Sequence, residues 1–177
     1  MISSALSSRR PRSVTLFLAA IALAGLFSGG ISHEAFAQAQ VLRGSVTVID
    51  GDTLKMGRQR IRLFGIDAPE SRQSCQTPQG QDWWCGSEAS KAVRSMVSDQ
   101  IVTCHQQDID RYNRVVAICE VDGRDLGEEL VDQGLAIAYR YFSRKYVPAE
   151  DRAKRARRGM WSGTFVEPYA WRKAQRR

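Results

Sequence analysis

Two very short turns near the beginning of the chain constrain its fold most. Residues 41–49, 53–56 and 60–64 are rich in strand-forming residues, and only three residues separate each segment from the next. Turns of this length join antiparallel neighbours in a sheet. We therefore expect a three-strand meander, with the acidic turn Asp50-Gly51-Asp52 at one of its ends.

The rest of the sequence alternates short strands and helices. Periodicity and turn residues predict a long loop over 65–86, followed by a helix that is capped by Ser87 and reaches about 97. A hairpin of strands 101–105 and 115–121 comes next. Two further helices follow, one that begins at Asp125 and Glu128 and ends before Gly134, and one over 148–159. About five strands and three helices in this order favour a small α+β domain. A partly closed, five-stranded Greek-key barrel would bury such short strands.

The first 37 residues have the pattern of a secretory signal peptide. They contain a basic segment with Arg9, Arg10 and Arg12, then an apolar run over 14–27, then the small-residue motif Ala35-Phe36-Ala37. An uncleaved membrane anchor is the alternative, but the apolar run is short for a membrane span. We expect residues 38–177 to be one exported, periplasmic or secreted domain, monomeric, with a core at about 46–161 and an extension over 162–177.

All four cysteines follow this leader, which favours disulfides. Their spacing does not fit a zinc site, and four cysteines allow three pairings. Cys104 and Cys119 flank a predicted turn near 108–113, where residues on opposite strands are close enough to bridge. We therefore predict the pairs Cys104–Cys119 and Cys75–Cys85, the second of which closes part of the long loop.

Three carboxylates lie where the meander ends. Asp52 is in the acidic turn, and Asp67 and Glu70 follow the third strand, on either side of Pro69. Side chains at strand ends can converge, and two carboxylates, a carbonyl and waters suit a Ca²⁺ ion. A further carboxylate can act as a general base. Taken alone, each aspartate is more typical of an ordinary turn than of a metal site, and Glu70 could be a solvated loop residue.

Two arginines accompany the carboxylates. Arg62 lies in the third strand, and Arg114 ends the charged turn that begins at Asp110. A guanidinium binds phosphate oxygens through a planar pair of donors. The set suits phosphodiester hydrolysis, although a solvated strand arginine and a turn arginine are the plain alternatives. The net charge of +7 stays positive without the leader and suits a polyanionic partner.

The scarcity of histidine excludes several mechanisms. His105 is the single histidine after the leader, beside Cys104 and polar residues. Nucleases that use a histidine base or several histidine ligands are therefore disfavoured, as are serine or cysteine nucleophiles activated by histidine. Metal and carboxylate chemistry remains.

With these residues in place, the chain resembles the staphylococcal nuclease (thermonuclease) family from about 46 to 161. The matching segments are 49–53, 62–70, 110–114, 130–136 and 159–162. The resemblance implies an OB-fold barrel with helices, Ca²⁺-dependent cleavage of DNA and RNA, and products that end in a 3′-phosphate.

The resemblance also assigns roles. Asp52 and Asp67 match the calcium carboxylates, Ala68 the carbonyl ligand, Glu70 the residue that activates water, and Arg62 and Arg114 the phosphate-binding arginines. Tyr112, Tyr139 and Tyr141 match positions that contact substrate, although half-buried strand aromatics are an equal alternative for the last two. The chain departs from the family in the loop over 71–86, which carries Cys75 and Cys85, and at Asn113, which replaces a glycine.

Two non-enzymatic readings stay open. An OB-fold module could bind single-stranded nucleic acid through a basic groove and stacked aromatics after losing catalysis. A calcium-binding or structural domain would not require Arg62 and Arg114 together. The tail beyond 162 suggests no catalytic role; packing of its aromatic residues is the default.

Overall fold

The computed structural model describes residues 40–176. The expected signal peptide lies outside the described residues. The meander is present as β1 (Val41–Gly44), β2 (Thr47–Val48), β3 (Thr53–Met56) and β4 (Gln59–Leu63). The first expected strand is thus two segments, because β1 and β2 pair with different neighbours, β8 and β3 respectively.

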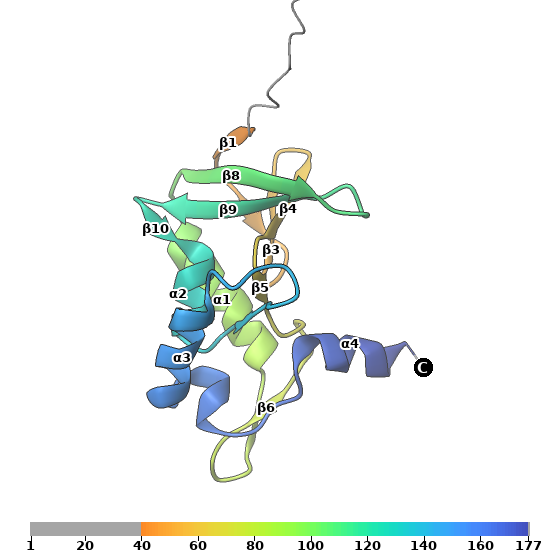
Figure 1. Cartoon of the computed structure of the whole chain (residues 1–177), viewed down its shortest axis with the longest axis vertical. Coiled ribbons are helices and arrows are strands. Elements are labelled where there is room, and N and C mark those ends of the chain that lie inside the picture. Colours follow the sequence, from red (N-terminus) through yellow and green to blue (C-terminus); the bar gives the residue numbers. More distant parts are fainter. Residues whose placement is uncertain (1–39, 177) are drawn as a thin grey trace, which may run out of the picture. The chain divides into compact units, whose positions relative to one another are not determined.

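The main sheet closes on itself through this divided strand. Its order is β1-β8-β9-β4-β3-β2, with β8 at Val102–Ile109 and β9 at Val115–Val121, and β10 (Arg124–Asp125) extends β9. Within this sheet β4 and β9 are parallel and the other pairs antiparallel. Counting β1 and β2 as one bent strand and setting aside the two-residue β10, which pairs antiparallel with β9, gives five strands in an OB-like barrel, so the predicted α+β fold is confirmed (Figure 1).

Alternation along β4 separates the core from the site. Ile61 and Leu63 are buried in the hydrophobic core together with Leu54 of β3. Successive side chains of a strand point to opposite faces, so Arg62 lies on the other face, and its side chain is 17% exposed. Helices α1 (Cys85–Val97) and α2 (Leu126–Asp132) contribute buried residues to the same core.

Helix boundaries differ from expectation in two places. Helix α1 begins at Cys85, not after Ser87, with Trp84 as an N-cap that makes no side-chain capping bond. Its first turn is fixed instead by the Cys75–Cys85 disulfide. Helix α3 (Val147–Arg155) ends before the expected residue 159, because Arg157 takes a positive φ of 49°. Asp125 caps α2 as predicted and accepts hydrogen bonds from the backbone of Gly127 and Glu128.

The described residues hold one more α-helix than the three predicted. After a 3₁₀ turn over Gly159–Ser162, the tail forms α4 (Pro168–Gln175). Proline at the start of α4 suits a helix N-terminus. No helix between residues 40 and 176 combines the length and the apolar character that crossing a membrane would require.

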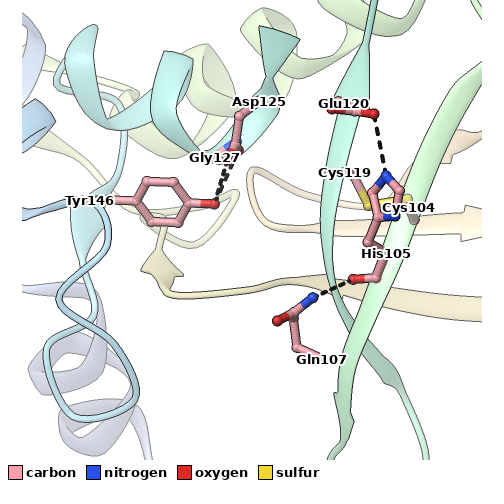
Figure 2. Close-up of a disulfide and its surroundings, with 8 residues drawn as sticks. All are labelled: Cys104, His105, Gln107, Cys119, Glu120, Asp125, Gly127 and Tyr146. Atoms are coloured by element: carbon pink, nitrogen blue, oxygen red, sulfur yellow. Dashed lines mark hydrogen bonds and ion pairs between the residues drawn. A yellow bond between two sulfur atoms is a disulfide. The ribbon is translucent and has the colours of Figure 1, made fainter. Parts of the chain in front are cut away.

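Both predicted disulfides are present. Cys104 and Cys119 are direct partners in the β8–β9 ladder. Figure 2 shows this bridge, and it also shows Tyr146, whose hydroxyl donates to the Asp125 carboxylate at 2.8 and 3.1 Å. The same carboxylate thus caps α2 and anchors the buried tyrosine before α3.

The long loop is ordered by short strands. It contains β5 (Ile66–Asp67), β6 (Cys75–Gln76) and β7 (Asp82–Trp83). Strands β6 and β7 pair with each other, and β5 pairs with β11 (Ile137–Ala138). The pairing with β11 brings Asp67 opposite Ile137 and places the aromatic segment that follows β11 beside the predicted site.

Candidate active site

The backbone of the meander brings the first two site residues together. Asp52 precedes β3, and the first residue of that strand, Thr53, pairs with Arg62. The amide of Leu63 donates to the carbonyl of Asp52 at 2.8 Å. Asp67 follows after one tight turn at Gly65, which has a φ of 69°. The local sequence therefore determines this juxtaposition.

Arg62 bridges the two predicted metal carboxylates. Its Nη1 contacts Asp52 Oδ1, and its Nη2 donates to Asp67 Oδ1 at 3.0 Å and to the carbonyl of Ile66 at 3.2 Å. Both aspartates are buried, Asp67 completely. Because two nitrogens of one guanidinium hold them, the two carboxylates are immediate neighbours in a place with little water.

The charges of this cluster perturb one another. Burial raises the pKa of Asp67, and the positive charges of Arg172 and Arg62 oppose that rise. Burial and the neighbouring charge of Asp52 raise the pKa of Asp50 to about 6. Burial acts to lower the pKa of Arg62, but Asp52 and Asp67 outweigh it and the pKa rises. The site is a concentration of negative charge that favours cations.

Glu70 is held by its backbone while its carboxylate remains accessible. Gln73 accepts from the Glu70 amide at 3.2 Å through its side chain and donates to the Glu70 carbonyl at 2.7 Å through its backbone. The Glu70 side chain is 35% exposed, and its Oε1 accepts from Arg172 at 3.0 Å. A carboxylate on a rigid backbone, open to solvent, is suited to act on a water molecule.

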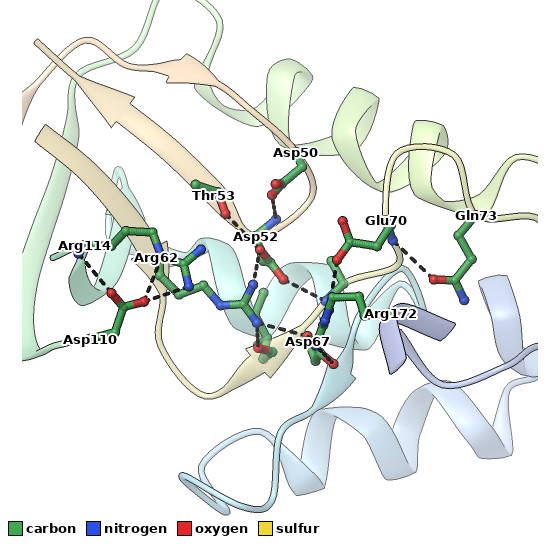
Figure 3. A network of polar contacts seen from close by, with 12 residues as sticks. Asp50, Asp52, Thr53, Arg62, Asp67, Glu70, Gln73, Asp110, Arg114 and Arg172 are labelled. Atoms are coloured by element: carbon green, nitrogen blue, oxygen red, sulfur yellow. Dashed lines mark hydrogen bonds and ion pairs between the residues drawn. The ribbon is translucent and has the colours of Figure 1, made fainter. Parts of the chain in front are cut away.

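Arg114 lies at the other end of the polar network from Glu70 (Figure 3). Asp110 fixes it, accepting from its backbone at 3.0 Å and from its Nε and Nη2 at 2.7 Å. Burial acts to raise the pKa of Asp110, but the hydrogen bonds from Arg114, together with one from the backbone of Tyr112, outweigh it and the pKa is lowered. Asn113 has a φ of 59°, so the turn uses the left-handed conformation that asparagine tolerates.

Exposed aromatic side chains gather in two places, in the segment after β11 and at the turn that carries Arg114. Tyr139 and Tyr141 have ring centroids 6.3 Å apart, and Phe142 lies 5.2 Å from each of them. Tyr141 is 84% exposed. Tyr112 is also exposed, with the guanidinium carbons of Arg111 and Arg114 at 5.0 and 5.6 Å from its ring centroid. Exposed aromatic rings near arginines are suited to stacking on nucleobases.

Comparison with known proteins identifies the family of this chain. A model of the family described as "Staphylococcal nuclease homologue" matches residues 60–163. The chain belongs to this family. The matched segment contains Arg62, Asp67, Glu70 and Arg114, while Asp52 and Arg172 lie outside it. The family resemblance inferred from the sequence is confirmed.

Individual relatives carry mixed names. The succinoglycan biosynthesis protein ExoI of Rhizobium meliloti (strain 1021) is 33% identical over 162 residues, which cover 90% of this chain and 80% of that protein. Protein ParB of Escherichia coli is 35% identical over 181 residues, covering 92% and 93% respectively. A micrococcal nuclease of Shigella flexneri is 31% identical over 153 residues, covering 76% and 82%.

The family implies a metal, and the donors available here are oxygens. Asp52 and Asp67 offer two adjacent carboxylates, and Ala68, whose amide donates to Asp52 Oδ2 at 3.1 Å, adds a backbone carbonyl. Within residues 40–176 no group of three or more acidic, histidine or cysteine side chains is arranged around a metal position. Two carboxylates and a carbonyl, completed by water, still fit a hard cation such as Ca²⁺, because Ca²⁺ takes six to eight oxygen ligands.

The sequence did not indicate two participants. Arg172 of α4 donates to both Asp67 and Glu70, and Phe142 joins the tyrosine pair. For Phe142, a third aromatic residue in the segment after β11 was an available signal. For Arg172 no local signal exists, because its partners lie more than a hundred residues earlier in the chain.

Proposed function

We propose that this protein is an exported, Ca²⁺-dependent nuclease that hydrolyses phosphodiester bonds of DNA and RNA with little sequence preference. The observation that carries the proposal is the bridge from Arg62 to the buried pair Asp52 and Asp67, with the accessible carboxylate of Glu70 beside it. Membership of a nuclease-named family and a micrococcal nuclease among the relatives support the same chemistry.

Asp52, Asp67 and the carbonyl of Ala68 would hold the cation. When bound there, Ca²⁺ supplies Lewis-acid polarisation of a phosphate oxygen. The oxygen-only donor set supports Ca²⁺ over zinc, which favours nitrogen and sulfur ligands.

Glu70 and the two arginines would perform the remaining work. Glu70 accepts the proton of the attacking water. General-base catalysis of this kind increases the rate by roughly 10²–10⁴-fold. Arg62 and Arg114 donate to the phosphate oxygens, whose charge grows as the water attacks. By analogy with the family, the expected products end in a 3′-phosphate.

The surroundings support a polymeric substrate. Phosphate contacts carry no sequence information, and rings such as Tyr112, Tyr139 and Tyr141 can stack on any base. Little sequence preference and activity on both DNA and RNA follow from such contacts.

Export and domain organisation belong to the same proposal. Two disulfides between residues 40 and 176 are typical of proteins that fold in an oxidising compartment. With the signal-peptide pattern of residues 1–37, they support a periplasmic or secreted domain over 38–177, acting as a monomer.

The test is cleavage of single- and double-stranded DNA and RNA by the purified, oxidised protein, with Ca²⁺ and with EGTA. Calcium-dependent cleavage that is lost in Glu70→Gln and Arg114→Ala establishes both the activity and its site. Salt-sensitive binding without cleavage under any metal would instead identify an OB-fold binding module that has lost catalysis.

A further inference from the structure

The C-terminal helix inserts an arginine between the proposed metal ligand and the proposed base. Arg172 Nη2 donates to both Asp67 oxygens at 3.0 Å, and Nη1 donates to Glu70 Oε1 at 3.0 Å (Figure 3). The Arg172 side chain is 25% exposed, whereas Asp67 is fully buried. One guanidinium therefore joins the buried carboxylate of Asp67 to the exposed carboxylate of Glu70.

These contacts use the same lone pairs that a cation would need. A carboxylate offers about four lone-pair positions. Asp67 already accepts one hydrogen bond from Arg62 and two from Arg172. A divalent ion beside Asp67 would also lie next to the positive guanidinium of Arg172, and like charges at such distances repel strongly where water is scarce. A cation at this carboxylate therefore competes with the present Arg172 contacts for lone pairs.

Of the two arginines on Asp67, Arg172 is the one that can move away. Arg62 is part of β4, inside the barrel ladder, and is also tied to Asp52. Arg172 belongs to α4, in which Pro168 is the single buried residue among those of the helix. The chain before α4 is anchored separately, because Gln73 Nε2 donates to the carbonyl of Val166 at 2.7 Å. Helix α4 can therefore leave without disturbing the loop that carries Glu70.

Charged and titratable residues of α4 and of the position after it also act on two tyrosines of the proposed substrate surface. Burial raises the pKa of Tyr139, with smaller contributions from Asp67 and from Tyr169 of α4. Arg111 lowers the pKa of Tyr112, and Arg176, which follows α4, adds to that effect. The contacts of α4 with the site are those of Arg172 with Asp67 and Glu70.

We propose that Arg172 is an intramolecular competitor of the metal ion at Asp67 and Glu70, and that binding of the ion releases α4 from the site. This inference rests on the proposed function, because it concerns the same cation. Arg172 thereby sets the metal affinity of the site.

The test compares the full-length oxidised protein with its Arg172→Gln variant by Ca²⁺ titration in a calorimeter, without nucleic acid. The expected result is Ca²⁺ binding about tenfold tighter in Arg172→Gln, because no charge-assisted hydrogen bonds have to be broken first. Lys173→Gln is the matched control: it removes one positive charge from an exposed position on the same helix, and its affinity should change little.

Hydrogen exchange of the amides of 169–176 is the second measurement. Ca²⁺ should accelerate exchange of these amides in the wild type, while in Arg172→Gln they should exchange fast with or without Ca²⁺. Unchanged or weaker Ca²⁺ binding in Arg172→Gln, or α4 amides that Ca²⁺ protects, would overturn the inference.

Failure of the proposed function gives a different pattern. If neither protein binds Ca²⁺ at millimolar concentration and neither cleaves nucleic acid, the calcium site itself is wrong and the inference is overturned with it. Binding that is present, is lost in Asp67→Asn and is indifferent to Arg172→Gln overturns the competition alone.

Discussion

Gly86, in the first turn of α1, lies directly against the backbone carbonyl of Glu70: a methyl group added at Gly86 would lie 1.7 Å from that oxygen. We expect Gly86→Ala to push the Glu70 loop away from α1 and to cost roughly 1–3 kcal/mol of unfolding free energy. Nuclease activity should fall further than stability explains, because Glu70 is displaced. Urea unfolding and initial rates measure both effects. In Gly44→Ala, where the added methyl makes only ordinary contacts at 3.6 Å, both should stay near wild type.

Arg62 neutralises two buried carboxylates, so its removal should lower the free energy of unfolding substantially. In Arg62→Gln, Asp52 and Asp67 face each other without the bridging cation. Breaking a buried pair by removing one partner costs about 3–5 kcal/mol, and we expect a loss near the lower value because Arg172 still contacts Asp67. Urea unfolding in EDTA measures it. Arg60→Gln, at an exposed position of the same strand, is the control. An Arg62→Gln protein as stable as this control would contradict the bridge.

Arg114 should separate catalysis from stability. Its ion pair with Asp110 is about one-fifth exposed on each side, at a hairpin turn outside the hydrophobic core. We expect Arg114→Ala to lose at most about 1 kcal/mol of stability and roughly 10²–10³ in rate, since one donor to the transition state is removed. Single-turnover cleavage measures the rate. Arg124→Ala, in β10, should retain the wild-type rate, and comparable rates in the two variants would remove Arg114 from the mechanism.

Glu150 should make the stability of the fold depend on pH. Burial acts to raise its pKa, but hydrogen bonds and charges from Arg140 and Lys154, at 2.5 and 2.8 Å, outweigh it and the pKa is lowered. Because the pKa of Glu150 is lower in the folded state, Glu150 stabilises the fold fully at pH values above its ordinary pKa of 4.5. This stabilisation is lost as the pH falls through the lowered pKa. Glu150→Gln should therefore be destabilised at neutral pH.

The pH profile provides the control for that prediction. Thermal unfolding of wild type and Glu150→Gln from neutral pH downward should show curves that converge in acid, as Glu150 becomes protonated in the wild type. A constant difference at every pH would mean that Glu150 acts by shape and not by charge.

Local sequence was enough to predict the centre of the site. Short turns fix which residues of the meander face each other, so the neighbourhood of Asp52 and Arg62 follows from spacing alone. The Cys104–Cys119 bridge follows in the same way from the β8–β9 turn. The start of α1 was misplaced at Ser87 because a capping preference is weaker than the Cys75–Cys85 disulfide that fixes the first turn.

Contacts between distant segments could not be predicted. Arg172 reaches Glu70 across 102 positions of sequence, and no periodicity or motif in the tail marks that residue. The placement of the segment after β11 beside Asp67 depends on the β5–β11 pairing, whose strands have only two residues each. Pairings that short leave no pattern that a sequence can display.

The barrel is closed by its first strand, and that determines when it can form. Val41 pairs with His105, so the ladder of β1 has no partner until the chain is made well past its middle. Pairing over such a separation must first overcome the entropy of closing a long loop. Under the export proposed above, this delay would be useful, since an unclosed chain can still pass through a narrow channel and needs to become a barrel only on the far side.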